Sequence, residues 1–206
     1  PALFFVLGLS TIFLLLGFCI GGINTVILFP TFFSQAEYGL TRAIVDTATI
    51  LSILATLGST PVIYKFHPFY RSHVAPSRND LPFITGILCL LGFLAVCLAG
   101  FVFKDLIIRK LGKSPLFAEH FFWVYPATFF MLAYTWMEAF GWALKKTVTT
   151  NFLRETLVRL ITTVLILLVW WQWISKETFI QLFSLLYAIP VVILLFILWK
   201  SREWTF

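Results

Sequence analysis

Charged residues are scarce in this chain, and their scarcity excludes an ordinary water-soluble domain. Only 12% of the 206 residues are charged, 60% are hydrophobic, and the mean hydropathy is +0.96. Soluble domains carry about a quarter charged residues and a smaller apolar excess. Because a chain of this length cannot bury so much apolar surface in one core, the excess must face lipid or a partner protein. We therefore predict that the lipid bilayer surrounds most of the molecule.

Cysteine and histidine are also scarce, which leaves little material for disulfides, metal sites or catalysis. The three cysteines, Cys19, Cys89 and Cys97, lie inside apolar runs, and their odd number and wide spacing fit neither a disulfide framework nor a zinc site. The sequence contains no His-Glu-x-x-His, Gly-x-Ser-x-Gly or P-loop spacing. We therefore predict a protein with no catalytic residues, no metal and no cofactor, which is not an enzyme.

The basic residues do not form a surface for nucleic acid. Lys and Arg number 15 against 9 Asp and Glu, giving a formal charge of +6. They are confined to segments between apolar runs, where the positive-inside bias of membrane proteins puts them. No continuous basic stripe is available to follow a phosphate backbone, so nucleic acid is not an expected partner.

Apolar runs long enough to cross a bilayer of about 30 Å recur along the whole sequence. They lack the alternating pattern of an outer-membrane β-barrel, so strands are not expected. The predicted fold is an all-α, polytopic membrane helix bundle of about six transmembrane helices. Their predicted ranges are residues 11–33, 40–64, 81–103, 121–144, 157–174 and 179–199.

The orientation of these helices follows from the Lys and Arg residues on alternate connections. Lys and Arg are more numerous on the side of the membrane where the first helix begins and the last one ends, although the connection from Lys104 to Lys113 on the other side is also basic. Because cytoplasmic loops carry the excess of Lys and Arg, both termini are predicted to be cytoplasmic.

Charged and polar residues inside the predicted spans are the candidates for function. An ionisable group in hydrocarbon is costly and is retained mainly where it is paired or faces water. Arg42 and Asp46 lie at i and i+4 on one face of the second helix. Two interpretations stay open: a local salt bridge at the outer interface, or an Arg42 that faces an aqueous cavity. Asn24 is a polar candidate for the same cavity from the first helix.

The fourth and fifth helices contribute the other charged candidates. If they form an antiparallel hairpin whose turn centres near Val148, Glu138 and Arg159 are about equally far from that turn. We therefore predict a buried ion pair between them, as structural support or as cavity lining. Arg154 and Glu155 are predicted at the cytoplasmic start of the fifth helix, where they either anchor it at the interface or form the mouth of a cationic cavity.

Small residues and a proline predict where helices pack closely or bend. Gly17, Gly21 and Gly22 in the first helix favour close approach of a neighbouring helix or a bend. Pro190 is predicted to kink the sixth helix, because proline removes one backbone hydrogen bond.

Two stretches of the sequence resemble a known family. The segment GGINTVILFPTFFSQAEYGLTRAIVDTATILSILATLGSTPVIYKFHPFYR, Gly21 to Arg71, resembles the beginning of bacterial polysaccharide or O-antigen flippases of the multidrug/oligosaccharidyl-lipid/polysaccharide superfamily, with the acidic-aromatic-Gly turn at Glu37, Tyr38 and Gly39. The segment NFLRETLVRLITTVLILLVWWQWIS, residues 151–175, looks like their fifth helix, with an RExxxR-like beginning.

This resemblance implies a fold and a function. Such flippases have two pseudo-symmetric lobes that face each other across a central cavity, so residues 1–206 would form the N-terminal lobe and a C-terminal lobe would be its partner. They move lipid-linked oligosaccharide, carried on polyprenyl pyrophosphate, across the bacterial cytoplasmic (inner) membrane by alternating access. The pyrophosphate head passes through a cationic cavity while the tail stays in lipid. Arg42 matches an arginine of the second helix, whereas the first helix here has no Arg or Lys.

Other classes of membrane protein remain alternatives at this point. A drug/cation antiporter of the same superfamily would need an acidic residue deep in the first helix, which is absent. A membrane-embedded ligase or acyltransferase of lipid-linked glycan assembly would show a large extracytoplasmic loop or a convergent His and carboxylate. A membrane scaffold that transports nothing is a further alternative.

Overall fold

The computed structural model describes residues 2–74, 78–111 and 115–200, and every regular element in these ranges is a helix. The first helical run consists of α1 (Ala2–Ile23), a π-helical turn η1 (Asn24–Leu28) and α2 (Phe29–Phe32), without a break between them. The backbone becomes extended at Phe33. The predicted all-α fold is therefore confirmed.

The next helix, α3 (Gln35–Ala55), begins with a capping box. The Ser34 side chain accepts a hydrogen bond from the Glu37 backbone N–H at 3.3 Å, and the Glu37 carboxylate accepts one from the Ser34 N–H at 2.7 Å. These two bonds satisfy backbone donors that a helix start otherwise leaves free. They explain why the helix begins at residue 35 and not at the predicted residue 40.

The prediction of one helix over residues 40–64 is wrong, because the chain breaks after α3. Leu57 and Gly58 have φ values of 45° and 78°, in the left-handed region, and α4 (Ser59–His73) starts anew after them. Glycine adopts this conformation without steric cost, so Gly58 allows the break. Gly92 lies so close to the carbonyl of Ala55 that a side chain there would overlap the backbone at this break.

The middle of the chain agrees with the prediction. Helix α5 (Leu81–Val102) matches the predicted span 81–103, and α6 (Lys104–Leu111) follows it. The short helix α7 (Pro115–His120) and the 3₁₀ turn η3 (Phe121–Trp123) lead into α8 (Val124–Ala143), within the predicted span 121–144.

The last two predicted spans have different boundaries. The fifth helical run consists of α9 (Thr147–Asn151), the π-helical turn η4 (Phe152–Leu157) and α10 (Val158–Trp170), so it begins well before the predicted residue 157. The sixth is divided into α11 (Lys176–Ser184) and α12 (Ala188–Lys200). Pro190 lies in the first turn of α12 and has no N–H to bond the carbonyl four residues earlier, which accounts for the interruption just before it.

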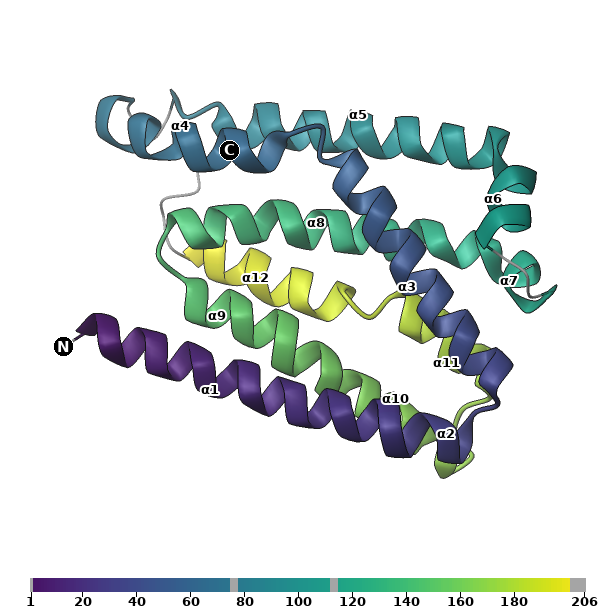
Figure 1. Cartoon of the computed structure of the whole chain (residues 1–206). Coiled ribbons are helices and arrows are strands. Elements are labelled where there is room, and N and C mark those ends of the chain that lie inside the picture. Colours follow the sequence, from purple (N-terminus) through teal and green to yellow (C-terminus); the bar gives the residue numbers. More distant parts are fainter. Residues whose placement is uncertain (1, 75–77, 112–114, 201–206) are drawn as a thin grey trace.

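These helices form a bundle around α8 (Figure 1). Helix α8 packs against α3, α4, α5 and α12, and α1 packs along the run from α9 to α10. Figure 1 shows α1 beside that run at one side of the bundle and α5 at the other, with α3 crossing between them. The candidate site lies where α1, α3 and the α9–α10 run come together.

Five helical stretches in the described part of the chain are long and apolar enough to cross a membrane. They are Gly8–Phe32, Gln35–Ala55, Leu81–Val102, Pro115–Ala143 and Lys176–Lys200. The run from α9 to α10 carries three charged residues, Arg154, Glu155 and Arg159, in its interior. Many large apolar side chains are exposed on the outside of the bundle, among them Phe18, Phe101 and Trp199. This is the surface expected where lipid replaces water.

Candidate binding cavity

A cavity of about 530 Å³ lies between the first helical run, α3, the α9–α10 run and the interruption before α12. Its lining combines polar and charged side chains with apolar walls, as ligand sites commonly do. The polar and charged lining residues are Asn24, Thr25, Tyr38, Thr41, Arg42, Arg154, Glu155, Arg159, Thr162 and Tyr187. The apolar lining includes Phe18, Val26, Phe29, Val45, Met131, Val158, Phe183 and Leu186.

Two π-helical turns place side chains in this cavity. The turn η1 contributes Asn24, Thr25 and Val26, and η4 contributes Arg154 and Glu155. A π-helical turn widens a helix by one residue and is often found at functional sites. Here both turns lie at the contact between the first helical run and the α9–α10 run, so that contact and the cavity share the same residues.

Small residues let these two runs approach each other closely. A Cβ atom added at Gly21 would lie 2.9 Å from Nη1 of Arg159, and one added at Gly17 would overlap the backbone carbonyl of Glu155. The predicted close packing is therefore confirmed at Gly17 and Gly21. Gly22, in contrast, has no atom within 4 Å of such a Cβ.

Asn24 joins the two runs by hydrogen bonds. Its Nδ2 donates to the backbone carbonyl of Arg159 at 3.0 Å, and its Oδ1 accepts from the Thr163 hydroxyl at 2.8 Å. The Asn24 residue is 3% exposed. Its amide therefore positions Arg159 as well as lining the cavity.

Arg42 faces the cavity from α3. Its Nε donates to the Tyr38 hydroxyl at 3.0 Å and its Nη2 to the Thr25 hydroxyl at 3.3 Å, and the guanidinium lies 5.4 Å from the Tyr38 ring centre. Within the described residues no ion pair joins Arg42 to Asp46, so the local salt bridge considered from the sequence is not present. Arg42 instead bonds Tyr38, which lies one turn earlier on the same helix. Asp46 does not line the cavity.

The predicted ion pair between Glu138 and Arg159 is wrong. Glu138 instead accepts a hydrogen bond from Nη1 of Arg154 at 2.8 Å. Arg159 donates from Nη2 to Glu155, also at 2.8 Å. The turn between α8 and the next helix centres at Lys145 and not near Val148, because α8 ends at Ala143 and α9 already begins at Thr147. Arg154 is therefore the residue that lies across from Glu138.

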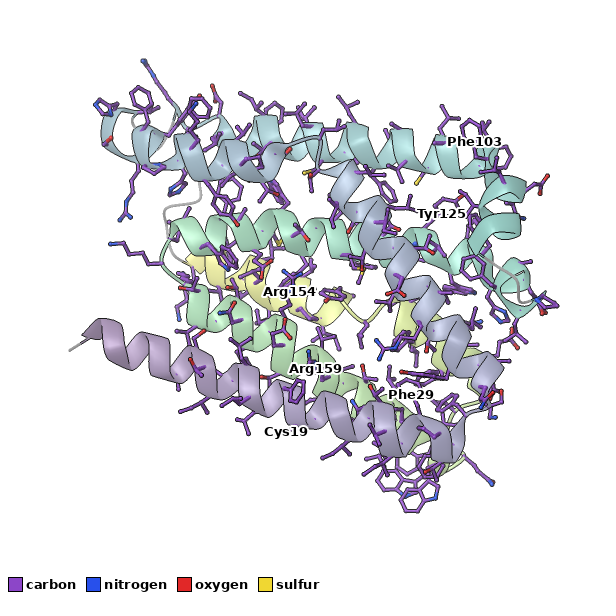
Figure 2. The ribbon with its side chains drawn as sticks, in the orientation of Figure 1. Cys19, Phe29, Phe103, Tyr125, Arg154 and Arg159 are labelled. Carbon is purple, nitrogen blue, oxygen red and sulfur yellow. The ribbon has the colours of Figure 1, made fainter. Side chains whose placement is uncertain are left out.

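The earlier helix start also corrects the place of Arg154 and Glu155. They were predicted at the cytoplasmic start of the fifth helix, but they lie about two turns inside a run that begins at Thr147. The Glu155 backbone lies against Gly17, and Arg154 contacts Glu138 in the interior of the bundle. Figure 2 shows Arg154 and Arg159 along this run, between α1 and α12. Arg154, Glu155, Arg159, Arg42 and Asn24 thus share one cavity, whereas Glu138 lies behind it.

Several lining residues were not singled out from the sequence. Tyr38 belonged to a noted motif, and its spacing of one turn before Arg42 is the signal that could have identified it. Thr25 and Tyr187 carried no such signal. Tyr187 reaches the cavity because α11 ends at Ser184 and the chain turns before α12.

The charges on the cavity wall favour an anion. Three arginines, Arg42, Arg154 and Arg159, line it together with one carboxylate, Glu155. Within the described residues, no three His, Cys, Asp or Glu side chains come together as a metal-binding group.

The fold and this cavity define a class of protein. The chain is a multi-pass membrane protein, an all-α bundle with apolar helices for contact with the bilayer and a polar, cationic cavity among them. No protein-family model, curated protein or solved structure matches the chain.

Proposed function

We propose that this chain forms one lobe of a membrane transporter that flips lipid-linked oligosaccharide, carried on polyprenyl pyrophosphate, across the cytoplasmic membrane of a bacterium by alternating access. The observation that carries the proposal is the convergence of Arg42, Arg154 and Arg159 on one cavity inside an apolar bundle. Guanidinium groups are costly in such surroundings and are retained mainly where they are paired, meet water or bind an anionic ligand. Arg154 and Arg159 are paired with Glu138 and Glu155, whereas the partners of Arg42 are neutral hydroxyls. The resemblance of the segments at Gly21–Arg71 and residues 151–175 to flippases supports the same function.

The arginines suit a pyrophosphate group. A guanidinium presents several N–H donors in a planar fork that matches phosphate oxygens, and such charged hydrogen bonds are stronger than neutral ones. Arg42 is the most available of the three, because its present partners are the neutral hydroxyls of Tyr38 and Thr25. An incoming phosphate can replace these hydroxyls without breaking an ion pair.

The edge of the cavity suits a lipid tail outside it. Phe18 and Val26 line the cavity and are also 72% and 73% exposed. A polyprenyl chain can lie against these residues in the lipid while its head group lies among the arginines. Asn24, Thr25 and Tyr38 supply neutral hydrogen-bonding groups for sugar hydroxyls.

The proposed orientation follows from the basic residues at one end of the bundle. Lys65, Lys145, Lys146 and Lys200 lie toward the end where α1 and α9 begin and α8 and α12 finish, and we assign this end to the cytoplasm. A C-terminal lobe would face this one across the cavity. The excess of arginine over carboxylate makes the cavity a poor site for the cationic substrate of a drug/cation antiporter.

The test removes one arginine in the full-length protein, in cells whose surface polysaccharide depends on it. We expect Arg42→Ala to reduce polysaccharide export by at least about tenfold, since one hydrogen bond from a charged group contributes about 1.5–3 kcal/mol and 1.4 kcal/mol corresponds to tenfold in affinity. Arg78→Ala is the matched control, because Arg78 is exposed and is not part of the cavity lining.

Export and protein abundance in the membrane are measured together. Normal export at normal abundance in Arg42→Ala would remove Arg42 from the substrate site and with it the main support for the proposal. Equal loss in Arg42→Ala and Arg78→Ala would mean that positive charge matters for topology and not for the cavity. Arg42→Lys should retain part of the activity, since it keeps the charge but loses the planar fork.

A further inference from the structure

Behind the cavity, Glu138 of α8 is a buried carboxylate that is only half satisfied. The residue is 4% exposed. Its Oε2 accepts the hydrogen bond from Arg154 at 2.8 Å, whereas its Oε1 has no hydrogen-bond partner. Buried polar atoms are rarely left without a partner, and an ionised carboxylate is the most costly group to leave so. The ionised form of Glu138 therefore depends on Arg154.

Arg154 belongs to both the buried carboxylate and the cavity. Its side chain is 47% exposed and lines the cavity, and its Nε lies 4.0 Å from Oε1 of Glu155. Glu155 in turn accepts the hydrogen bond from Arg159. A row of alternating charges thus leads from the interior at Glu138 to the cavity wall at Arg159.

Among the described residues, the other titratable groups shown to act on Glu138 electrostatically are three tyrosines and a carboxylate, and none of these is a cation. Those within electrostatic range are Tyr64 of α4, Tyr134 of α8 itself, Tyr187 from the turn before α12, and Glu155 of η4. The Tyr134 hydroxyl donates to the carbonyl of Thr150 at 2.7 Å. Among the described residues, Arg154 is the one cation that contacts Glu138.

We infer that Glu138 is a proton-binding site coupled to the anion site of the cavity. An anion that binds Arg154 adds negative charge beside Glu138 and takes part of the positive charge that Arg154 supplies to it. Glu138 then accepts one proton from solution at Oε1, becomes a neutral carboxylic acid, and no longer requires Arg154. When the anion leaves, Arg154 returns to Glu138 and the proton is released. The inference rests on the proposed binding of an anionic substrate in the cavity.

The coupling has a definite sign. Proton and anion are taken up together, so each strengthens the binding of the other by the same factor. Where Glu138 is ionised in the free protein and protonated in the complex, the affinity for the anion rises about tenfold for each pH unit that the pH falls.

The first experiment needs no ligand. Infrared spectra of the purified full-length protein report a protonated carboxyl through its C=O stretch. At neutral pH we expect this band in Arg154→Gln, its absence in the wild type, and its loss again in the double variant Arg154→Gln/Glu138→Gln. The matched control is the double variant Arg154→Gln/Glu155→Gln, in which the band of the protonated carboxyl should remain. If Arg154→Gln shows no protonated carboxyl at neutral pH, Glu138 stays ionised without its partner and the inference is overturned.

The second experiment measures the coupling with inorganic pyrophosphate as the probe. Calorimetric titration in buffers of different ionisation enthalpy counts the protons taken up on binding. We expect the wild type to take up about one proton more than Glu138→Gln, and its affinity to gain about tenfold more per pH unit. Pyrophosphate itself changes its protonation on binding, and this contribution cancels when the proton uptake of Glu138→Gln is subtracted from that of the wild type. Equal proton uptake in the two proteins overturns the coupling.

The two experiments also separate this inference from the proposed function. Loss of export in Arg42→Ala together with equal proton uptake in wild type and Glu138→Gln keeps the transporter and removes the proton site. If pyrophosphate does not bind at all, the anion site and the coupling fall together, even when the infrared band of Arg154→Gln shows that Glu138 can bind a proton.

Discussion

The contact between α1 and the η4 turn builds one wall of the cavity, and a single methyl group tests it. Gly17 faces the backbone carbonyl of Glu155 so closely that a Cβ atom would overlap it. Gly22 lies on the same helix, and a Cβ atom there would have no other atom within 4 Å. Gly17→Ala and Gly22→Ala therefore make the same chemical change, and only one of them has an obstacle.

The magnitude follows from two opposing effects. Extra methyl groups in a packed interior cost about 1–3 kcal/mol, and the upper end, about 3 kcal/mol, applies at Gly17 because a backbone carbonyl cannot rotate away as a side chain can. Alanine is favoured over glycine in a helix by about 1 kcal/mol. Gly17→Ala should therefore lower the free energy of unfolding by about 2 kcal/mol, and Gly22→Ala should raise it by up to about 1 kcal/mol.

The assay is reversible unfolding of the full-length protein in detergent, followed by tryptophan fluorescence as the fraction of denaturing detergent increases. We expect Gly17→Ala to unfold at a lower fraction than the wild type, and Gly22→Ala at the same or a higher one. Equal stability of the two variants would refute the reasoning, since it would mean that α1 does not lie against η4 at Gly17.

Two further predictions concern the hydrogen bonds that hold the first helical run and α3 in place. Asn24→Leu removes the hydrogen bonds to Arg159 and Thr163. Because one bond between membrane helices contributes about 0.6 kcal/mol, the loss should lower the unfolding free energy by about 1 kcal/mol. The control Thr31→Val loses a bond only within its own helical run and should unfold like the wild type. Ser34→Ala removes the cap of α3 and should lower the unfolding free energy by about 1 kcal/mol in the same assay. Ser34→Asp should keep the wild-type stability, because aspartate also caps helices. An equal loss of stability in both variants would show that the cap does not stabilise α3.

Long apolar runs made the helices predictable. The span predicted at 81–103 agrees with Leu81–Val102 within a residue, because no charge or break interrupts it. The break after Ala55 was missed, since hydropathy does not respond to backbone conformation and Leu57 and Gly58 are as apolar as their neighbours. The start of the fifth run was missed because charged residues interrupt its apolar stretch. Its charges are of a kind typical of an interface, although in the structure they lie inside the bundle.

The candidate site was only partly predictable. Rare charges and amides within apolar surroundings identified Arg42, Asn24, Arg154, Glu155 and Arg159, all of which line the cavity. Their pairing was not predictable, because it depends on the register between two helices. A shift of the turn by about three residues, together with the extra width of η4, decides that Arg154 and not Arg159 meets the buried carboxylate.

By itself the sequence determined that this protein is an α-helical bundle with an apolar exterior, because hydrophobicity and helix length act locally along the chain. It also identified the few charged residues whose burial among apolar helices is costly and therefore points to pairing or to function. Only the tertiary structure decided which of these charges meet, since contacts between helices depend on turns, π-helical bulges and glycine contacts that act between distant segments. The shared cavity of Arg42 and Arg159, and the half-satisfied carboxylate of Glu138 behind it, exist only once those segments are packed together.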